Sequence, residues 1–323
     1  NTADKILSLN LNDSNGQSLL RAGLQANDEA DTGATGNDWL KTDGAAANAF
    51  TFNTTGKVDG TNGVAWSATT DFNVADLLLT DFGASPGLQN YSRGSFWIKV
   101  DDSANAALTA ADDLVLQISA ANDATSLQDV AVPASADNVW QRVDFALSGV
   151  TSAARYVGLR AVSTGQLADT FTVYIDNIVF YNDSISVNFA GSLVATGAGA
   201  PALVTLRDSS GAIRGYGYET GTAAAGTAII FIGADIGSAV AATGNNINLS
   251  STATQFDLYV DTATAVNNAT TGADSVSLSI NLGNSTTAGD IKWYDNAVTI
   301  TSPISWVMPV TGQSTPLSRS TGY

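Results

Sequence analysis

Residues 140–147, WQRVDFAL, decide the fold class because apolar side chains recur at every second position. Val143, Phe145 and Leu147 share this spacing, with polar or small residues between them. Successive side chains of a β-strand point to opposite faces of its sheet. The stretch therefore predicts a strand with one face in an apolar core.

The same alternation recurs along the whole chain, with turn residues between the segments. Before residue 184 it covers 5–11, 94–100, 114–119, 155–162 and 171–181. After residue 184 it covers 186–193, 202–206, 228–233, 255–260, 275–282 and 290–294. Only 74–79 and 108–114 have room for a helical turn or two, and a connecting loop is the alternative for both. The pattern predicts an all-β chain of antiparallel sheets.

The length of 323 residues is sufficient for two domains, and the composition changes near Tyr181. Beyond this residue the chain is richer in Ala, Gly and Thr. From Ser302 onward three prolines predict an extended tail. We therefore predict two tandem antiparallel β-sandwich domains at 1–183 and 184–323, the second ending in this tail.

The formal net charge of −17, with only 13 Lys and Arg residues, excludes nucleic acid and anionic membranes as partners. No apolar run is long enough to span a bilayer. The first residues contain neither Met nor a charged-then-apolar leader, which favours a mature secreted chain.

Cysteine and histidine are both absent from the sequence. This excludes disulfides, thiolate nucleophiles and histidine-based triads. Glycoside hydrolysis would require two carboxylates across a cleft, and no local motif supports such a pair. We therefore predict that the protein is not an enzyme.

Three segments carry a family resemblance in the first domain: SFWIKV at 95–100, WQRVDFALS at 140–148 and TVYIDNIVF at 172–180. In this order they resemble the strands of carbohydrate-binding-module-like jelly-roll sandwiches. In the second domain, segments 257–261, 274–279, 292–295 and 306–312 are similar to the C-terminal region of surface proteins of candidate-phyla bacteria. The resemblance implies an extracellular location at the cell surface.

Several polar and aromatic residues fall on the faces of these strands that point away from the core. If the strands are neighbours, their rings and planar polar groups suit a glycan, since sugars bind to flat aromatics beside hydrogen-bonding side chains. In the alternative, the tryptophans pack against a loop or the second domain and the charges pair with each other. The candidate residues are Trp97, Lys99, Gln117, Arg142, Asp144, Arg160 and Tyr174.

The alternation in 171–181 slips near Asp176 and Asn177, where a bulge is expected. In the modules that the chain resembles, an Asp here helps to hold a structural Ca²⁺, and Asp13 would supply a matching ligand. The alternative is a capped turn without metal. No other cofactor is expected.

Apolar segments near both ends suggest assembly. Residues 5–11 present Leu7, Leu9 and Leu11, and residues 304–310 contain Ile304, Trp306 and Val307. Each segment can pair within its own domain or add to the open sheet edge of a neighbouring copy. We predict a secreted structural subunit that self-associates into an extracellular filament or surface layer. A glycan-binding adhesin or carbohydrate-binding module is the alternative.

Overall fold

A computed structural model gives the fold of the chain. It describes residues 3–11, 19–20, 22–25, 39–42, 49–60, 62–67, 76–82, 87–101, 114–133, 138–162, 172–191, 201–222, 225–233, 246–249, 251–261, 274–279, 291–292 and 317–321.

The regular secondary structure of the described chain is β-strand with one exception, which confirms the predicted fold class. Its one helical element is a single 3-10 turn, η1 (Leu88–Asn90). In the described residues no helix is both long and apolar enough to cross a membrane.

The chain divides into two compact units, and one of them is inserted into the other. We call Leu24–Phe180, with Gly237–Val240, the inserted unit. The terminal unit consists of Asn1–Gly23, Tyr181–Ile236 and Ala241–Tyr323.

The inserted unit contains two antiparallel sheets. A six-stranded sheet has the order β11-β8-β13-β6-β5, with β3 beside β13. A five-stranded sheet has the order β10-β9-β12-β7-β4. The strands of the six-stranded sheet are β3 (Leu24–Gln25), β5 (Ala49–Asn53), β6 (Gly63–Ser67), β8 (Arg93–Asp101), β11 (Gln141–Ala146) and β13 (Thr172–Tyr181). Those of the five-stranded sheet are β4 (Trp39–Thr42), β7 (Leu77–Asp81), β9 (Leu114–Ser119), β10 (Gln128–Ala131) and β12 (Tyr156–Ala161).

The apolar faces of these two sheets form a sandwich core. Phe96, Ile98, Val173 and Ile175 of the six-stranded sheet are fully buried, as are Leu114, Leu116, Ile118, Val157 and Leu159 of the five-stranded sheet. Edge-to-face rings connect the layers, because Phe82, next to β7, lies 5.2 Å from Phe180, whose ring lies 6.2 Å from Phe145. Of the three alternating residues of segment 140–147, Phe145 is buried, and Val143 and Leu147 are half-buried.

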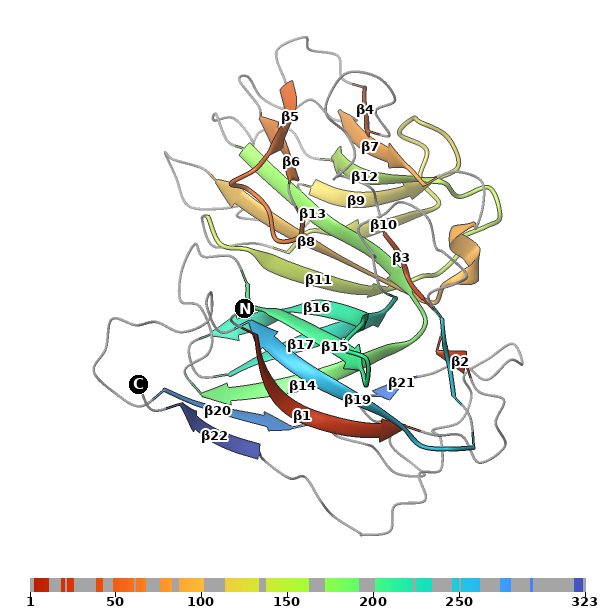
Figure 1. Cartoon of the computed structure of the whole chain (residues 1–323). Coiled ribbons are helices and arrows are strands. Elements are labelled where there is room, and N and C mark those ends of the chain that lie inside the picture. Colours follow the sequence, from red (N-terminus) through yellow and green to blue (C-terminus); the bar gives the residue numbers. More distant parts are fainter. Residues whose placement is uncertain are drawn as a thin grey trace. The chain divides into compact units, whose positions relative to one another are not determined.

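The terminal unit is built on one nine-stranded antiparallel sheet, with the order β1-β19-β15-β16-β17-β14-β20-β22 and β21 beside β14 (Figure 1). The strands are β1 (Ala3–Leu11), β14 (Ser184–Gly191), β15 (Leu203–Asp208), β16 (Ile213–Thr222), β17 (Ala225–Ile232), β19 (Thr254–Asp261), β20 (Asp274–Ser279), β21 (Ile291–Lys292) and β22 (Leu317–Thr321). The short strands β2 (Leu19–Leu20) and β18 (Ile247–Asn248) form a separate pair.

This sheet curls, because its two outermost strands, β1 and β22, come into contact. Its buried face carries Val204 and Leu206 from β15 and Leu258 and Val260 from β19, all at 1% exposure or less. The opposite face, which we call the outer face, carries the residues between them.

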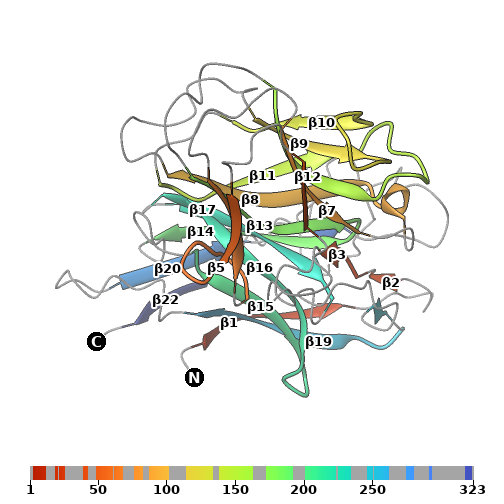
Figure 2. The same ribbon diagram turned by 90° about the horizontal axis from the view of Figure 1, so that it is seen from above.

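The N-terminal strand departs from the predicted division at residue 183. Figures 1 and 2 show β1 beside β19, and the register pairs Leu9 with Phe256. Residues 1–23 thus belong with the second half of the chain, although a strand crosses between the units at the expected place, near Tyr181. Alternation tells which face of a strand is buried, but it does not tell which strand pairs with it.

The structure also assigns the two segments with room for helical turns. Residues Leu77–Asp81 form β7, and Leu77, Leu78 and Leu79 are all buried. A strand buried on both faces shows no alternation, so a short apolar run of this kind is ambiguous in sequence. Of 108–114, only Leu114 lies within the described residues, where it begins β9.

Candidate functional site

The seven predicted glycan-binding residues lie on two different sheets of the inserted unit. Trp97 and Lys99 lie on β8, Arg142 and Asp144 on β11, and Tyr174 on β13, all in the six-stranded sheet. Gln117 lies on β9 and Arg160 on β12, in the five-stranded sheet. The glycan-site prediction required the strands of all seven residues to be neighbours. They are neighbours only within each sheet, so the seven residues do not form one surface.

On the outer face of the six-stranded sheet, the ammonium group of a lysine lies over two aromatic rings. Lys99 Nζ lies 4.5 Å from the ring centroid of Tyr174 and 5.4 Å from that of Trp140. Burial lowers the pKa of Lys99, and the charge of Asp101 partly opposes this shift. The turn at Gly56 also lies against Tyr174, since a Cβ at Gly56 would be 2.2 Å from the ring. These rings are engaged by the protein itself.

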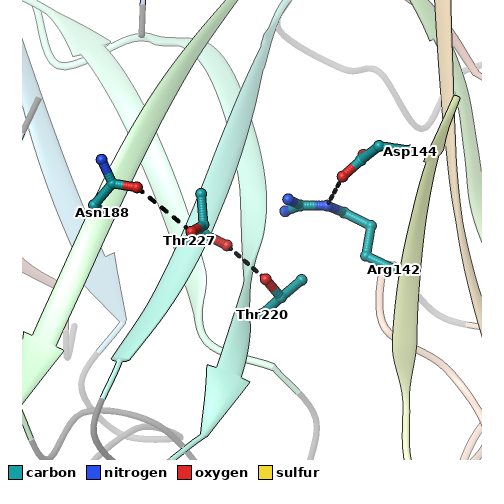
Figure 3. Close-up of polar contacts among 5 residues, drawn as sticks. All are labelled: Arg142, Asp144, Asn188, Thr220 and Thr227. Carbon is teal, nitrogen blue, oxygen red and sulfur yellow. Dashed lines mark hydrogen bonds and ion pairs between the residues drawn. The ribbon is translucent and has the colours of Figure 1, made fainter. Parts of the chain in front are cut away.

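The charges of this face are also paired. Arg142 Nε donates to Asp144 Oδ2 at 3.0 Å, as Figure 3 shows. Trp97 is only 2% exposed. The six-stranded sheet thus presents a face whose aromatic and charged groups already have partners.

The outer face of the five-stranded sheet is arranged differently. Gln117 is opposite Asp129 on β10 and opposite Gly158 on β12, so β9 lies between these strands. Arg160 Nη2 donates to Asp129 Oδ2. This ion pair therefore crosses β9 and covers Gln117, which is 0% exposed. We call Tyr156, Arg160, Asp129, Gln117 and Asn122 the outer polar face.

Three buried polar atoms of the outer polar face have no hydrogen-bond partner among the described residues: Gln117 Oε1, Arg160 Nε and Asn122 Oδ1. They lie in one region. Gln117 Nε2 donates to the carbonyl of Asp123 at 2.6 Å, which brings the turn that contains Asn122 onto this face. Buried polar groups in proteins nearly always have partners, so such atoms mark a place where water or a polar ligand completes the hydrogen bonding.

Tyr156 supplies an aromatic ring on the same face. It is half-buried and lies opposite both Ser119 and Asp81. The Arg155 guanidinium lies 5.0 Å from its ring centroid. Two hydrogen bonds to Asp81 fix this guanidinium, and the hydrogen bond is the main reason why the pKa of Arg155 is raised.

Gly158 separates Tyr156 from Arg160 along β12, all three on one face. A Cβ at this glycine would lie 2.1 Å from the carbonyl oxygen of Leu78. The close approach of β7 thus requires glycine, and no side chain stands between the tyrosine and the arginine. Their Cα atoms are about 13 Å apart, at about 3.3 Å per residue.

Sequence reasoning missed Tyr156, Asn122 and Asp129. The alternation of side chains along β12 could have identified Tyr156, because Tyr156 lies four positions before Arg160 and therefore on the same face. Nothing local identifies Asp129, because its role depends on the pairing of β10 with β9.

The predicted slip near Asp176 occurs, since Asn177 has a φ of 50°. Asp176 Oδ2 accepts hydrogen bonds from the backbone N–H groups of Val58 and Asp59, at 2.5 and 2.8 Å. Its Oδ1 accepts from the Asn177 N–H at 2.7 Å. The carboxylate therefore caps the turn that begins at Lys57.

The calcium site at Asp176 stays a prediction, because calcium also takes backbone carbonyl, amide and water oxygens that can complete its coordination. The oxygens of Asp176 receive N–H donors, and the described chain contains no group of three or more candidate metal ligands. Asp13, the other predicted ligand, lies outside the described residues, and its calcium role stays a prediction.

The predicted assembly segments have different positions. Leu7, Leu9 and Leu11 lie on β1, which pairs with β19 of the same chain. Ile304, Trp306 and Val307 lie outside the described residues.

No protein-family model and no curated protein matches the sequence. Among solved structures, the chain is similar to a family 11 carbohydrate-binding module from Clostridium thermocellum in complex with a β-1,3-1,4-mixed-linked tetrasaccharide. The match has 13% identity, covers 50% of this chain and 96% of the module, and has a TM-score of 0.33.

Two further similar structures are family 22 modules. One is the C-terminal module of Clostridium thermocellum Xyn10B, with 14% identity, coverage of 53% and 96%, and a TM-score of 0.32. The other is the N-terminal tandem from Paenibacillus barcinonensis Xyn10C, with 8% identity, coverage of 78% and 93%, and a TM-score of 0.31. Such TM-scores carry no weight for function, so a functional assignment depends on the chemistry of the sheet faces.

Proposed function

We propose that the protein is an extracellular, non-catalytic glycan-binding protein that binds sugars on the outer polar face of the inserted unit. The observation that carries this proposal is the cluster of polar atoms without partners around Gln117 and Arg160. A sugar presents hydroxyl groups that both donate and accept, so it is a ligand that can pair with the guanidinium and the carboxylate above this cluster at once.

The Arg160–Asp129 pair supplies the central contacts. The side chains are 15% and 36% exposed, so the pair reaches the surface. The guanidinium has five donors, and its contact with Asp129 uses one of them. The pair therefore brings a group that can donate next to a group that can accept, as binding to neighbouring hydroxyls of a sugar ring requires.

Tyr156 supplies a ring for the apolar C–H face of a second sugar unit. Binding sites commonly combine such aromatic surface with a few placed polar groups. The distance of about 13 Å from Tyr156 to Arg160 requires a ligand of more than one sugar unit. An oligosaccharide or polysaccharide is therefore the proposed ligand class.

Catalysis is not part of the proposal. Glycosidases use one carboxyl group as an acid and a second carboxylate as base or nucleophile. The two carboxylates described on this face, Asp129 and Asp81, each pair with an arginine. Neither is left free for proton transfer to a leaving group.

The filament or surface-layer role has less support. One of its two motivating segments, β1, is used within its own chain, where eight residues pair with β19. Self-association stays a prediction. Sedimentation velocity across a concentration series tests it, and a monomer at all concentrations would contradict it.

A glycan array that contains neutral and acidic oligosaccharides tests the proposed function. We expect the wild-type chain to bind neutral glycans of several sugar units, and Arg160→Ala to weaken that binding. Arg142→Ala is the matched control, because it removes an arginine from an Arg–Asp pair on the other sheet. No signal on the array, or equal losses in the two variants, would contradict the proposal.

A further inference from the structure

The outer face of the terminal unit carries a second set of guanidinium, carboxylate and tyrosine. Its strands are β1, β19 and β15, which are adjacent in the sheet. The register places Ser8, Asp257 and Arg207 in one row across these strands. Asp257 and Arg207 alternate with buried residues such as Phe256 and Leu206, so the row lies on the outer face.

Arg207 is held in one orientation by its neighbours. Its Nε donates to Thr205 Oγ1 at 3.2 Å, and its guanidinium lies 4.7 Å from the ring centroid of Tyr259. Stacking of this kind fixes a guanidinium while it leaves the terminal nitrogens available. Arg207 makes no further hydrogen bond or ion pair within the described part of the chain, so both Nη groups can donate to a ligand.

Asp257 is oriented in the same row. Its Oδ1 accepts hydrogen bonds from Ser8 Oγ at 2.7 Å and from Gln255 Nε2 at 2.9 Å. Ser8 and Gln255 are exposed, so this carboxylate lies at a solvent-facing surface. Since Ser8 comes from β1, the N-terminal strand contributes to a surface that residues from the second half of the chain otherwise form.

Two tyrosines lie beside this row. Tyr259 and Tyr216 both lie opposite Thr205, on either side of β15, and both are half-buried. Two strand spacings separate them by about 10 Å. They provide ring surface for successive units of an extended ligand, next to the charged row.

We propose that Tyr259, Arg207, Asp257 and Tyr216 form a second glycan-binding site, which we call the Tyr259 strip. The inference rests on the glycan-binding function proposed above and adds an independent site in the terminal unit. Its ligand class is a neutral glycan, because Asp257 lies within the strip and the chain has a net charge of −17, both of which repel anionic sugars. Arg207 supplies donors for hydroxyl groups, and the two tyrosines supply ring surface.

Calorimetric titration of the full chain tests the strip, with cellohexaose, xylohexaose, mannohexaose and hexagalacturonate as probes. We expect two sites per chain for at least one neutral probe. Tyr259→Ala should leave one site, or weaken one of the two by at least about tenfold. Arg207→Lys should act in the same direction, because lysine keeps the charge but loses the planar donors.

Thr227→Ala is the matched control, since Thr227 lies on the same outer face, on β17, three strands from β19. Figure 3 shows its contacts with Asn188 and Thr220. It should keep both sites. A single site that Arg160→Ala abolishes and Tyr259→Ala leaves intact would overturn the strip while the proposed function stands. A preference of the strip for hexagalacturonate would overturn its neutral ligand class, and no binding of any probe would overturn both proposals.

Discussion

The two outer faces of the inserted unit have similar ingredients and differ in whether those ingredients already have partners. Each face has an Arg–Asp pair and at least one aromatic ring. A cation lies over aromatic rings on both faces, since Lys99 lies over Trp140 and Tyr174 of the six-stranded sheet and Arg155 lies over Tyr156 of the five-stranded sheet. On the five-stranded sheet, the pair covers a glutamine whose carbonyl has no partner among the described residues.

The six-stranded sheet also has buried polar atoms without a partner among the described residues, Ser95 Oγ on its outer face and Asn177 Oδ1 beside the Asp176 cap. The comparison therefore depends on the three such atoms that gather around one surface-reaching Arg–Asp pair on the five-stranded sheet.

The comparison predicts that buried polar residues of the six-stranded sheet stabilise the folded protein and do not bind a ligand. Asp176→Ala should lower the free energy of unfolding by about 3–5 kcal/mol, because it leaves three buried N–H donors without an acceptor. Chemical denaturation measures this, with Asp123→Ala as a control on an exposed turn. An Asp176→Ala variant as stable as the wild type would show that the cap is dispensable.

A second prediction concerns Glu219, a buried acid of the terminal unit. It is 5% exposed, and burial raises its pKa to about 7 from 4.5. Between these two pKa values the folded state keeps a proton that the unfolded state releases, so the free energy of unfolding falls as the pH rises. Glu219→Gln should remove this slope and stabilise the protein at pH 8 by about 2–3 kcal/mol.

Thermal denaturation of the wild type and Glu219→Gln between pH 5 and pH 8 measures the effect. Two parallel stability curves would mean that Glu219 titrates near the usual value of a glutamate and is not buried as described.

The third prediction concerns binding through the five-stranded sheet. Arg160→Ala should weaken glycan affinity by about 2 kcal/mol, or about thirtyfold, because charge-assisted hydrogen bonds to the ligand are lost. Tyr156→Ala should cost about 1 kcal/mol through the loss of ring contact. Calorimetry with the glycan that binds most tightly on the array measures both affinities. Unchanged affinity in both variants would mean that the glycan binds at another site.

The smallest effect is expected at Lys99. Lys99→Met keeps the apolar stem between Trp140 and Tyr174 and removes a charge whose burial is unfavourable, as its lowered pKa shows. We expect a change in stability of less than about 1 kcal/mol and unchanged glycan affinity. A loss of affinity as large as that of Arg160→Ala would mean that the outer face of the six-stranded sheet also binds the glycan.

Much of the fold could be predicted from local pattern, and much of the site could not. Alternation places Gln117 and Arg142 on polar faces, and the slip at Asp176-Asn177 is visible in the sequence. The sheet to which each strand belongs is set by long-range pairing, so Gln117 and Arg142 could not be separated in advance. The contribution of Ser8 to the Tyr259 strip also depends on pairing across more than 240 residues.

Hydrogen–deuterium exchange of the full chain, with and without a saturating neutral oligosaccharide, tests the central claim most directly. We predict that the ligand slows exchange in β9, β10, β12 and the turn that contains Asn122, with the Tyr259 strip as the second protected region. Exchange in β8, β11 and β13 should stay unchanged. Protection centred on Lys99 and Tyr174 instead would contradict the claim that unpaired polar atoms identify the binding face.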